Sequence, residues 1–186
     1  MKKILSALIL SSLLLGACGG ASGKTTSEED TLFYTYETAE FSIETPRDWE
    51  TITAFPAEYP KEVRVAFRDN VKDIDFLANV SIIREEGTRT NMDHAQKKLS
   101  DHEATLLDFD LSSQEEIDLI VSAGESASML NTFIGKNSSD GPMLAFMQTY
   151  LTKGSKVWSV TASYSPNEDE FTIDNMEQML KSFTLK

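Results

Sequence analysis

Three aspartates at short spacing are the side chains of this sequence best suited to hold a metal ion. Asp69, Asp73 and Asp75 lie between two stretches that predict strands. Carboxylate oxygens at such spacing are the ligands that Ca²⁺ prefers, so these residues form a candidate divalent-cation site. The glycine and the distal glutamate of an EF-hand loop are absent, and a solvated acidic loop is the simpler interpretation. No other cofactor is predicted.

The two histidines, His94 and His102, offer the next candidate ligands. Eight residues apart on a predicted helix, they are separated by ~12 Å of axial rise, which is too far for one metal ion to bridge. The apolar stripe of that helix includes His102, so we expect a partly buried histidine there, whereas His94 is predicted to face solvent. The histidines therefore indicate no zinc site.

The sequence contains none of the common catalytic motifs. Gly124-Glu125-Ser126 comes nearest to the Gly-x-Ser-x-Gly turn of serine hydrolases, but Ser128 stands where the closing glycine is needed. No phosphate-binding glycine-rich loop and no dinucleotide-binding fingerprint occurs. We therefore predict that the protein is not an enzyme. A hydrolase with an unrecognised pair among the 30 acidic residues is the alternative.

The only cysteine, Cys18, stands at the end of a typical export signal. Two lysines near the start are followed by a short apolar run, and small residues precede the cysteine. The stretch Leu15-Gly16-Ala17-Cys18 resembles the lipobox of bacterial lipoproteins. This resemblance implies a signal peptide over residues 1–17, cleavage between Ala17 and Cys18, and a diacylglyceryl group on the Cys18 sulfur.

An anchor at Cys18 implies a location on the extracytoplasmic face of the cell membrane, or on the outer membrane if the cell is Gram-negative. Residues 18–30 consist mainly of Gly, Ser, Thr and acidic residues, a composition that predicts a flexible tether. Two acyl chains give stable anchoring. The apolar run before Cys18 is too short for a membrane span, which takes about 20 apolar residues.

The net charge of the chain is −13. Removal of residues 1–17 takes away Lys2 and Lys3 and no acidic residue, so the mature chain carries two positive charges fewer. Such a surface disfavours nucleic acid and anionic lipid headgroups, which attract clustered Lys and Arg. The sequence therefore predicts no nucleic-acid partner, and it predicts membrane contact through the lipid anchor.

Residues 31–186 have the length of one domain, and their periodicity predicts mixed α and β structure. Thr90 and Asp93 predict the capped start of a helix over 91–107. Ser165-Pro166 predicts the start of a second helix. Alternating or continuous apolar residues predict strands at 41–46, 49–55 (pairing back on the first), 63–68, 78–83, 117–121, 127–133, 143–151 and 158–164.

The segment Phe41-Ser-Ile-Glu-Thr-Pro-Arg-Asp-Trp49 is similar to the opening of PsbP-like and DcrB-like domains, which reads aromatic-x-aliphatic-x-x-Pro-x-x-Trp. The closing hairpin, the last helix and Ser182-Phe183 also match that family in kind. The resemblance covers residues 31–186 and implies an α-β-α sandwich of the α+β class, with a mainly antiparallel sheet between helices. It also implies a non-enzymatic binding or accessory module, and no metal-site motif of the family matches this chain.

Two aromatic residues in a proline-bracketed loop are candidates for contact with a partner. Phe55 and Tyr59 lie in the segment Phe55-Pro-Ala-Glu-Tyr-Pro60. Exposed aromatic side chains are common at protein-binding sites, so we expect an envelope protein or a small ligand to bind here. The alternative is a loop that folds over one edge of the sheet.

Overall fold

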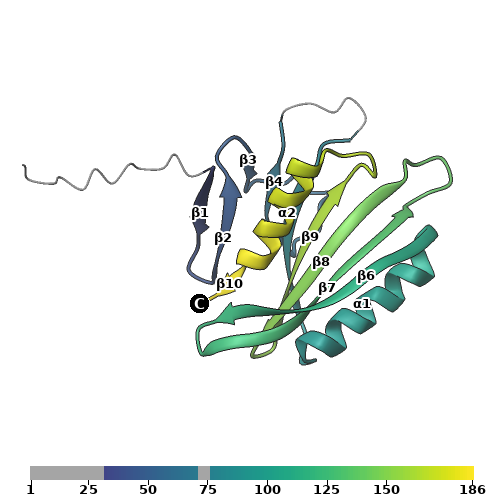
Figure 1. Ribbon diagram of the computed structural model, residues 1–186. Coiled ribbons are helices and arrows are strands. Elements are labelled where there is room, and N and C mark those ends of the chain that lie inside the picture. The colour runs from purple at the N-terminus through teal and green to yellow at the C-terminus, as the bar shows by residue number, and fades with distance from the viewer. Residues whose placement is uncertain (1–31, 71–75) are drawn as a thin grey trace, which may run out of the picture. The chain divides into compact units, whose positions relative to one another are not determined.

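The computed structural model describes residues 32–70 and 76–186, which form one mixed sheet and two helices (Figure 1). The strand order is β1-β2-β10-β6-β7-β8-β9-β5-β4-β3. Neighbouring strands are antiparallel except β10 and β6, which are parallel. The elements are β1 Phe33–Glu37, β2 Phe41–Pro46, β3 Glu50–Ile52, β4 Val63–Arg68, β5 Asn79–Glu86, α1 Asn91–Thr105, β6 Leu107–Val121, β7 Gly124–Lys136, β8 Leu144–Lys153, β9 Lys156–Tyr164, α2 Glu170–Ser182 and β10 Thr184–Leu185.

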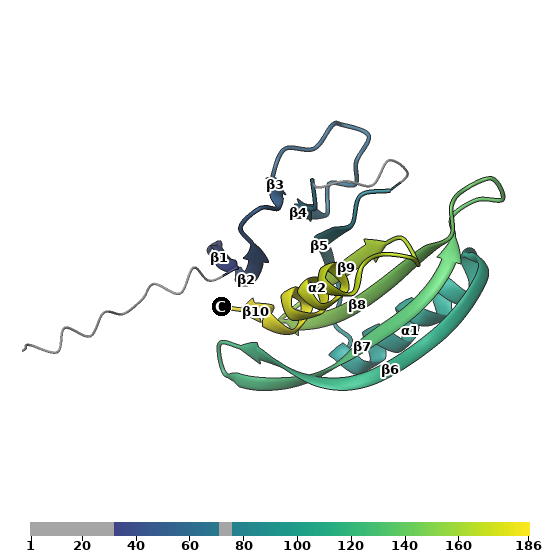
Figure 2. The same cartoon turned by 45° about the horizontal axis from the view of Figure 1, so that its top comes forward.

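The two helices lie on opposite faces of the curled sheet (Figures 1 and 2). α2 packs on the face that carries Met147 and Leu151 of β8. α1 packs on the other face, where its side chains meet Gln148 and Tyr150 of the same strand. β8 is therefore buried on both faces, as its continuous apolar sequence predicts. The expected α+β sandwich is confirmed.

The main core lies between the sheet and α2. Met176, Met179 and Leu180 of the helix are fully buried, and they share one apolar cluster with Ile43 of β2 and Phe67 of β4. Burial of each such side chain contributes ~1.5–3 kcal/mol. This core therefore joins strands from both ends of the sheet through a single helix.

The start of α1 agrees with the sequence prediction, and the start of α2 does not. Thr90 caps α1, and its hydroxyl oxygen accepts a hydrogen bond from the backbone N–H of Asp93 (3.1 Å). The prediction that α2 begins after Ser165 is wrong, because Ser165 starts a turn instead, closed by the backbone bond from Glu168 N–H (2.9 Å). Asp169 is the real N-cap, since its carboxylate accepts from the backbone N–H of Thr172 (2.9 Å).

Three predicted strands have different extents or partners in the structure. The strand predicted over 49–55 is the short β3, and its pairing is wrong, because it pairs with β4 rather than with β2. The strands predicted over 117–121 and 127–133 are parts of the longer β6 and β7. Most of β6 is exposed and polar, so apolar alternation marks only its buried end at Ile117 and Leu119. The predicted hairpin of β8 and β9 is confirmed.

Candidate functional site

The loop between β3 and β4 covers an apolar groove. Two turns shape it: the backbone N–H of Tyr59 donates to Pro56 O (3.0 Å) and that of Val63 to Pro60 O (3.2 Å). They bring the rings of Phe55 and Tyr59 to a centroid distance of 5.7 Å. The groove has a volume of about 530 Å³, and its lining residues are Ile52, Ala54, Phe55, Pro56, Tyr59, Pro60, Val63, Ala66, Arg68, Asn79 and Ser81.

The floor of this groove is the face of β4 and β5 that looks away from α2. Ala66 pairs with Ser81, and Arg68 pairs with Asn79, so all four side chains share that face. α1 packs mainly on β7 and β8 of the same face, and the loop between β3 and β4 lies over the strands beyond them. Arg68 forms an ion pair with Glu50 at the rim. The groove thus combines apolar walls, a small polar floor and one charged pair.

The aromatic residues predicted as a binding site are both at this groove. Tyr59 is 52% exposed, and Phe55 is half-buried beside it. Both interpretations of the sequence therefore describe part of the structure: the loop does lie over one end of the sheet, and it still presents an aromatic side chain to solvent. The binding of a partner at these residues stays a prediction.

The predicted cation site falls mostly beyond the described residues. Asp69 is described, and its backbone N–H donates to Ala78 O (2.9 Å), whereas Asp73 and Asp75 lie outside the described residues. In residues 32–70 and 76–186, no three His, Cys, Asp or Glu side chains are arranged to hold a metal ion. The calcium site therefore stays a prediction.

His94 is buried, so the expectation that it faces solvent is wrong. Only 6% of the residue is exposed, and its ring meets Tyr150 edge-on at 5.2 Å between centroids. The turn of the helix places position 94 beside Ala95 on the sheet-facing side. Its Nε2 lies 3.9 Å from the carboxylate of Glu85, beyond hydrogen-bond distance. Burial, with the nearby Lys98 ammonium, lowers the pKa of His94.

His102 is partly buried, as predicted, and belongs to a polar network under α1. Its Nε2 lies 3.0 Å from Oε1 of Gln148, which also accepts from the Tyr150 hydroxyl. Because that oxygen can only accept, the histidine must carry its proton on Nε2. The Gln148 amide donates to Thr161 (2.7 Å). Burial lowers the pKa of His102 and raises that of Tyr150, so this network holds neutral groups that secure the helix to the sheet.

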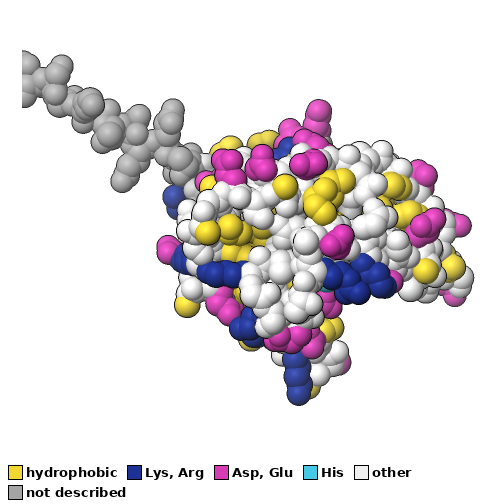
Figure 3. Space-filling model, turned by 90° about the horizontal axis from the view of Figure 1, so that it is seen from below, with side chains coloured by type: hydrophobic (Ala, Val, Ile, Leu, Met, Phe, Trp, Pro, Cys, Tyr) yellow, Lys and Arg dark blue, Asp and Glu magenta, His cyan; other side chains and the backbone are white. Residues whose placement is uncertain are grey.

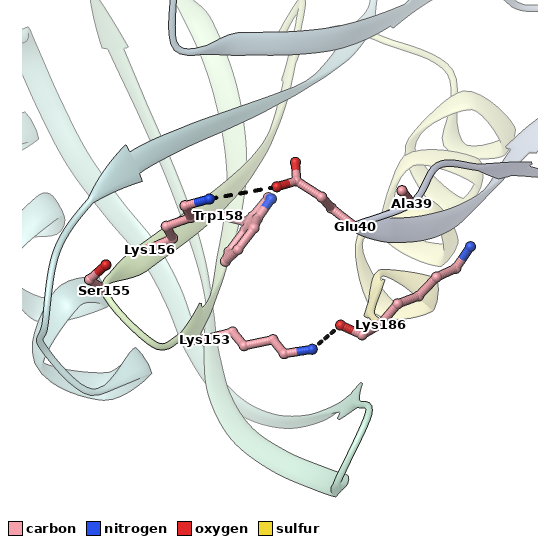
Figure 4. Close-up of a pocket in the computed structure, with 7 residues that line it drawn as sticks. All are labelled: Ala39, Glu40, Lys153, Ser155, Lys156, Trp158 and Lys186. Atoms are coloured by element: carbon pink, nitrogen blue, oxygen red, sulfur yellow. Dashed lines mark hydrogen bonds and ion pairs between the residues drawn. The ribbon is translucent and has the colours of Figure 1, made fainter.

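A second pocket, which the sequence did not reveal, lies between the β8–β9 turn and the end of the chain (Figure 4). Its volume is about 300 Å³. The Lys153 ammonium donates to Ser122 Oγ (2.7 Å) and to the backbone oxygen of Lys186. The Lys156 ammonium lies 3.8 Å from Glu40. Seen from below, the molecule carries clusters of Lys and Arg between acidic side chains (Figure 3).

The predicted signal peptide of residues 1–17, with Ala17 at its end, and the predicted lipid site at Cys18 lie outside the described residues, as does the tether. In the described part, neither helix has the length and hydropathy that crossing a membrane requires.

Solved structures resemble this chain, although no family model and no curated protein matches its sequence. Cyanobacterial PsbP (CyanoP) of Synechocystis sp. PCC 6803 aligns with a TM-score of 0.53 and 17% identity, over 92% of this chain and 99% of that one. The Ran-binding protein Mog1p of Saccharomyces cerevisiae aligns with a TM-score of 0.55 and 6% identity, over 81% and 94%. LpqN of Mycobacterium tuberculosis, involved in cell envelope biogenesis, aligns with a TM-score of 0.53 and 11% identity, over 84% and 93%.

These likenesses rest on the arrangement of the backbone, because the identities are too low to carry residue roles across. All three alignments span most of both chains. The shared architecture is a curled mixed sheet with two helices. The described part of this chain therefore has the PsbP-like fold, of the α+β class.

Proposed function

We propose that this protein is a bacterial lipoprotein, held on the extracytoplasmic face of a membrane by acyl chains on Cys18, whose PsbP-like domain is a non-enzymatic binding module. The observation that carries the binding role is the groove beside Phe55 and Tyr59, with its exposed aromatic ring. The domain docks an envelope protein through that groove, and the anchor keeps it near membrane-bound partners.

The chemistry of the groove supports a protein segment as its occupant. Its walls are apolar and its volume of about 530 Å³ accommodates a few side chains. Aromatic side chains in partly desolvated pockets supply much of the free energy of protein binding. The ion pair of Arg68 with Glu50 at the rim gives the partner a polar group to align against.

The structural neighbours favour a binding or accessory role. Mog1p is a Ran-binding protein, and LpqN is involved in cell envelope biogenesis. Neither description is that of an enzyme. A fold that Mog1p uses for protein binding, together with the groove at Phe55 and Tyr59, supports a docking role here.

Site-specific crosslinking in cells tests the docking role. With benzoyl-phenylalanine in place of Tyr59, irradiation should join the protein to a discrete partner. The matched control places the same residue at Phe171, which is 61% exposed on α2. The adduct at position 59 should vanish when Phe55 is also changed to Ala. Equal adducts from both positions, or none from position 59, would contradict the proposed site.

The anchor has its own test. Cys18→Ser removes the thiol to which the diacylglyceryl group attaches, so metabolic labelling with a fatty acid should fail and the signal peptide should stay on the chain. Ser12→Ala, within the signal region, serves as the control and should leave labelling intact. Persistent lipid labelling of the Cys18→Ser protein would refute the anchor.

A further inference from the structure

The pocket between the β8–β9 turn and the end of the chain contains two lysines that lie close to each other. Lys153 and Lys156 are directly opposed in the strand register, so their side chains leave the same face of the hairpin. Like charges directly opposite each other on a sheet repel and destabilise the pair. Glu86 of β5 lies opposite Lys156 in the strand register and offsets part of this repulsion.

The acid beside these lysines does not neutralise both of them. Glu40 is already paired with Arg84, at 2.5 Å between Oε1 and the guanidinium. Lys156 only approaches that carboxylate, at 3.8 Å, and Lys153 donates to Ser122 Oγ and to the main-chain oxygen of Lys186. Among the residues that line the pocket, three are lysines and Glu40 is the one acid, on a protein whose net charge is −13. Such a local reversal of charge attracts anions.

A buried donor without a partner points to where an anion would bind. Trp158 is 4% exposed, and its indole Nε1 has no hydrogen-bond partner. In Figure 4 the ring stands among the pocket residues, with its nitrogen-bearing edge toward Glu40. An unpaired buried N–H lowers the stability of the fold, and an oxygen acceptor would recover that loss. The side chains of Lys156 and Glu40 beside it are partly exposed.

We propose that this pocket binds a small oxyanion of the phosphate class, with the ammonium groups of Lys153 and Lys156 and the indole N–H of Trp158 as its donors. A tetrahedral phosphoryl group offers several acceptor oxygens in different directions, which suits three donors from three side chains. The volume of about 300 Å³ fits a phosphate or a simple phosphate ester. This site is independent of the groove at Tyr59.

Nuclear magnetic resonance of the full chain in a nonionic detergent tests the proposal directly. The protein has two tryptophans, so its ¹⁵N spectrum contains two indole signals, and Trp49→Phe identifies the signal of Trp158. Inorganic phosphate at millimolar concentration should shift the Trp158 signal saturably, whereas NaCl at equal ionic strength should not. No shift beyond that of NaCl would overturn the proposal.

Variants that remove charge distinguish specific phosphate binding from a general ionic effect. Lys153→Gln with Lys156→Gln should weaken phosphate binding by about tenfold or more, because two charge-assisted contacts are lost. Lys97→Gln with Lys136→Gln removes two partly exposed, ion-paired lysines elsewhere and should leave binding unchanged. If loss of the Lys153 contacts unfolds the chain, Lys156→Gln alone gives the same comparison. Equal weakening by the pocket variants and the control would overturn the proposal.

The source of the phosphoryl group is distinguished by two further titrations. A soluble ester, glycerol phosphate, and a short-chain phosphatidic acid present the same terminal phosphate. If the site takes a lipid headgroup, the phosphatidic acid should shift the Trp158 signal at lower concentration. Equal potency assigns the site to soluble esters. If neither compound shifts the signal, the proposal fails.

Discussion

At the scale of single residues, the two histidines of α1 that face the sheet link the stability of the fold to pH. Burial lowers the pKa of both, and the Lys98 ammonium lowers that of His94 further, against the opposing charge of Glu85. In the unfolded chain a histidine titrates near its ordinary pKa of ~6.5. Below that pH the unfolded state binds more protons than the folded state, so stability is lost as pH falls. Above it, this contribution to stability is fully present.

The free energy of unfolding should therefore be higher at pH 7.5 than at pH 5.0, as urea titrations can measure. His94→Phe keeps an aromatic ring against Tyr150 but has no proton to bind, so the loss between these two pH values should shrink. Ser100→Ala, on the exposed side of α1, serves as the control and should leave the loss unchanged. If the free energy of unfolding falls by the same amount in the His94→Phe protein, groups other than His94 control the pH dependence.

Asn91 is the residue that binds the start of α1 to the sheet. Its amide donates to Ala127 O (2.8 Å) and Ser126 Oγ (3.0 Å), and its oxygen accepts from the backbone N–H of Thr152 (2.7 Å). Asn91→Ala should cost about 2–4 kcal/mol, because it removes these bonds and leaves a backbone donor without its partner. Urea denaturation measures the cost. A loss below that of a typical surface substitution would contradict this role.

At the scale of elements, the true start of α2 can be tested by two capping substitutions. Asp169→Ala should destabilise the protein by about 1 kcal/mol, because the first turn loses the acceptor for Thr172. Ser165→Ala should change stability by no more than about 0.5 kcal/mol, since Ser165 lies outside the helix. Thermal and urea unfolding measure both. A larger loss of stability from Ser165→Ala than from Asp169→Ala would show instead that the helix begins after Ser165.

Local signals predicted the elements whose determinants are contiguous. Thr90 caps α1 as expected, because its partner is three residues away. The start of α2 was misplaced because Ser165 and Asp169 are both good capping residues, and the turn at Ser165 decides between them. Much of β6 was missed because its middle is a solvated, acidic strand that pairs only with β7. Hydrophobic alternation cannot mark a strand that is exposed on both faces.

At the scale of the whole molecule, Phe183 packs the end of the last helix into the core. It is fully buried where α2 ends and β10 begins, and its ring lies 5.6 Å from that of Phe41. Phe183→Ala should cost about 3–5 kcal/mol, as large cavities in a core do. Phe171→Ala, on the exposed side of the same helix, should cost no more than about 0.5 kcal/mol. Similar costs for both, measured by urea denaturation, would contradict this packing.

The two candidate sites differ in how far the sequence could reveal them. Phe55 and Tyr59 belong to one short loop, so their composition alone predicted a binding surface, and the structure then supplied the floor from β4 and β5. The oxyanion pocket combines Glu40, Lys153, Trp158 and Lys186, which come from four separate elements or turns. Only pairing of distant strands brings them together, and no local pattern marks such a set.

The export signal with its single cysteine stays a prediction from the sequence. By itself the sequence determined the periodic features of the described residues: the class of the fold, most of its strands and the start of α1. Each depends on neighbours within a few residues, where backbone geometry and side-chain spacing leave little choice. The tertiary structure alone decided that His94 is buried, that β3 pairs with β4, and that two lysines line one pocket with an unpaired indole. These depend on long-range packing, whose free energy is shared among contacts far apart in the chain.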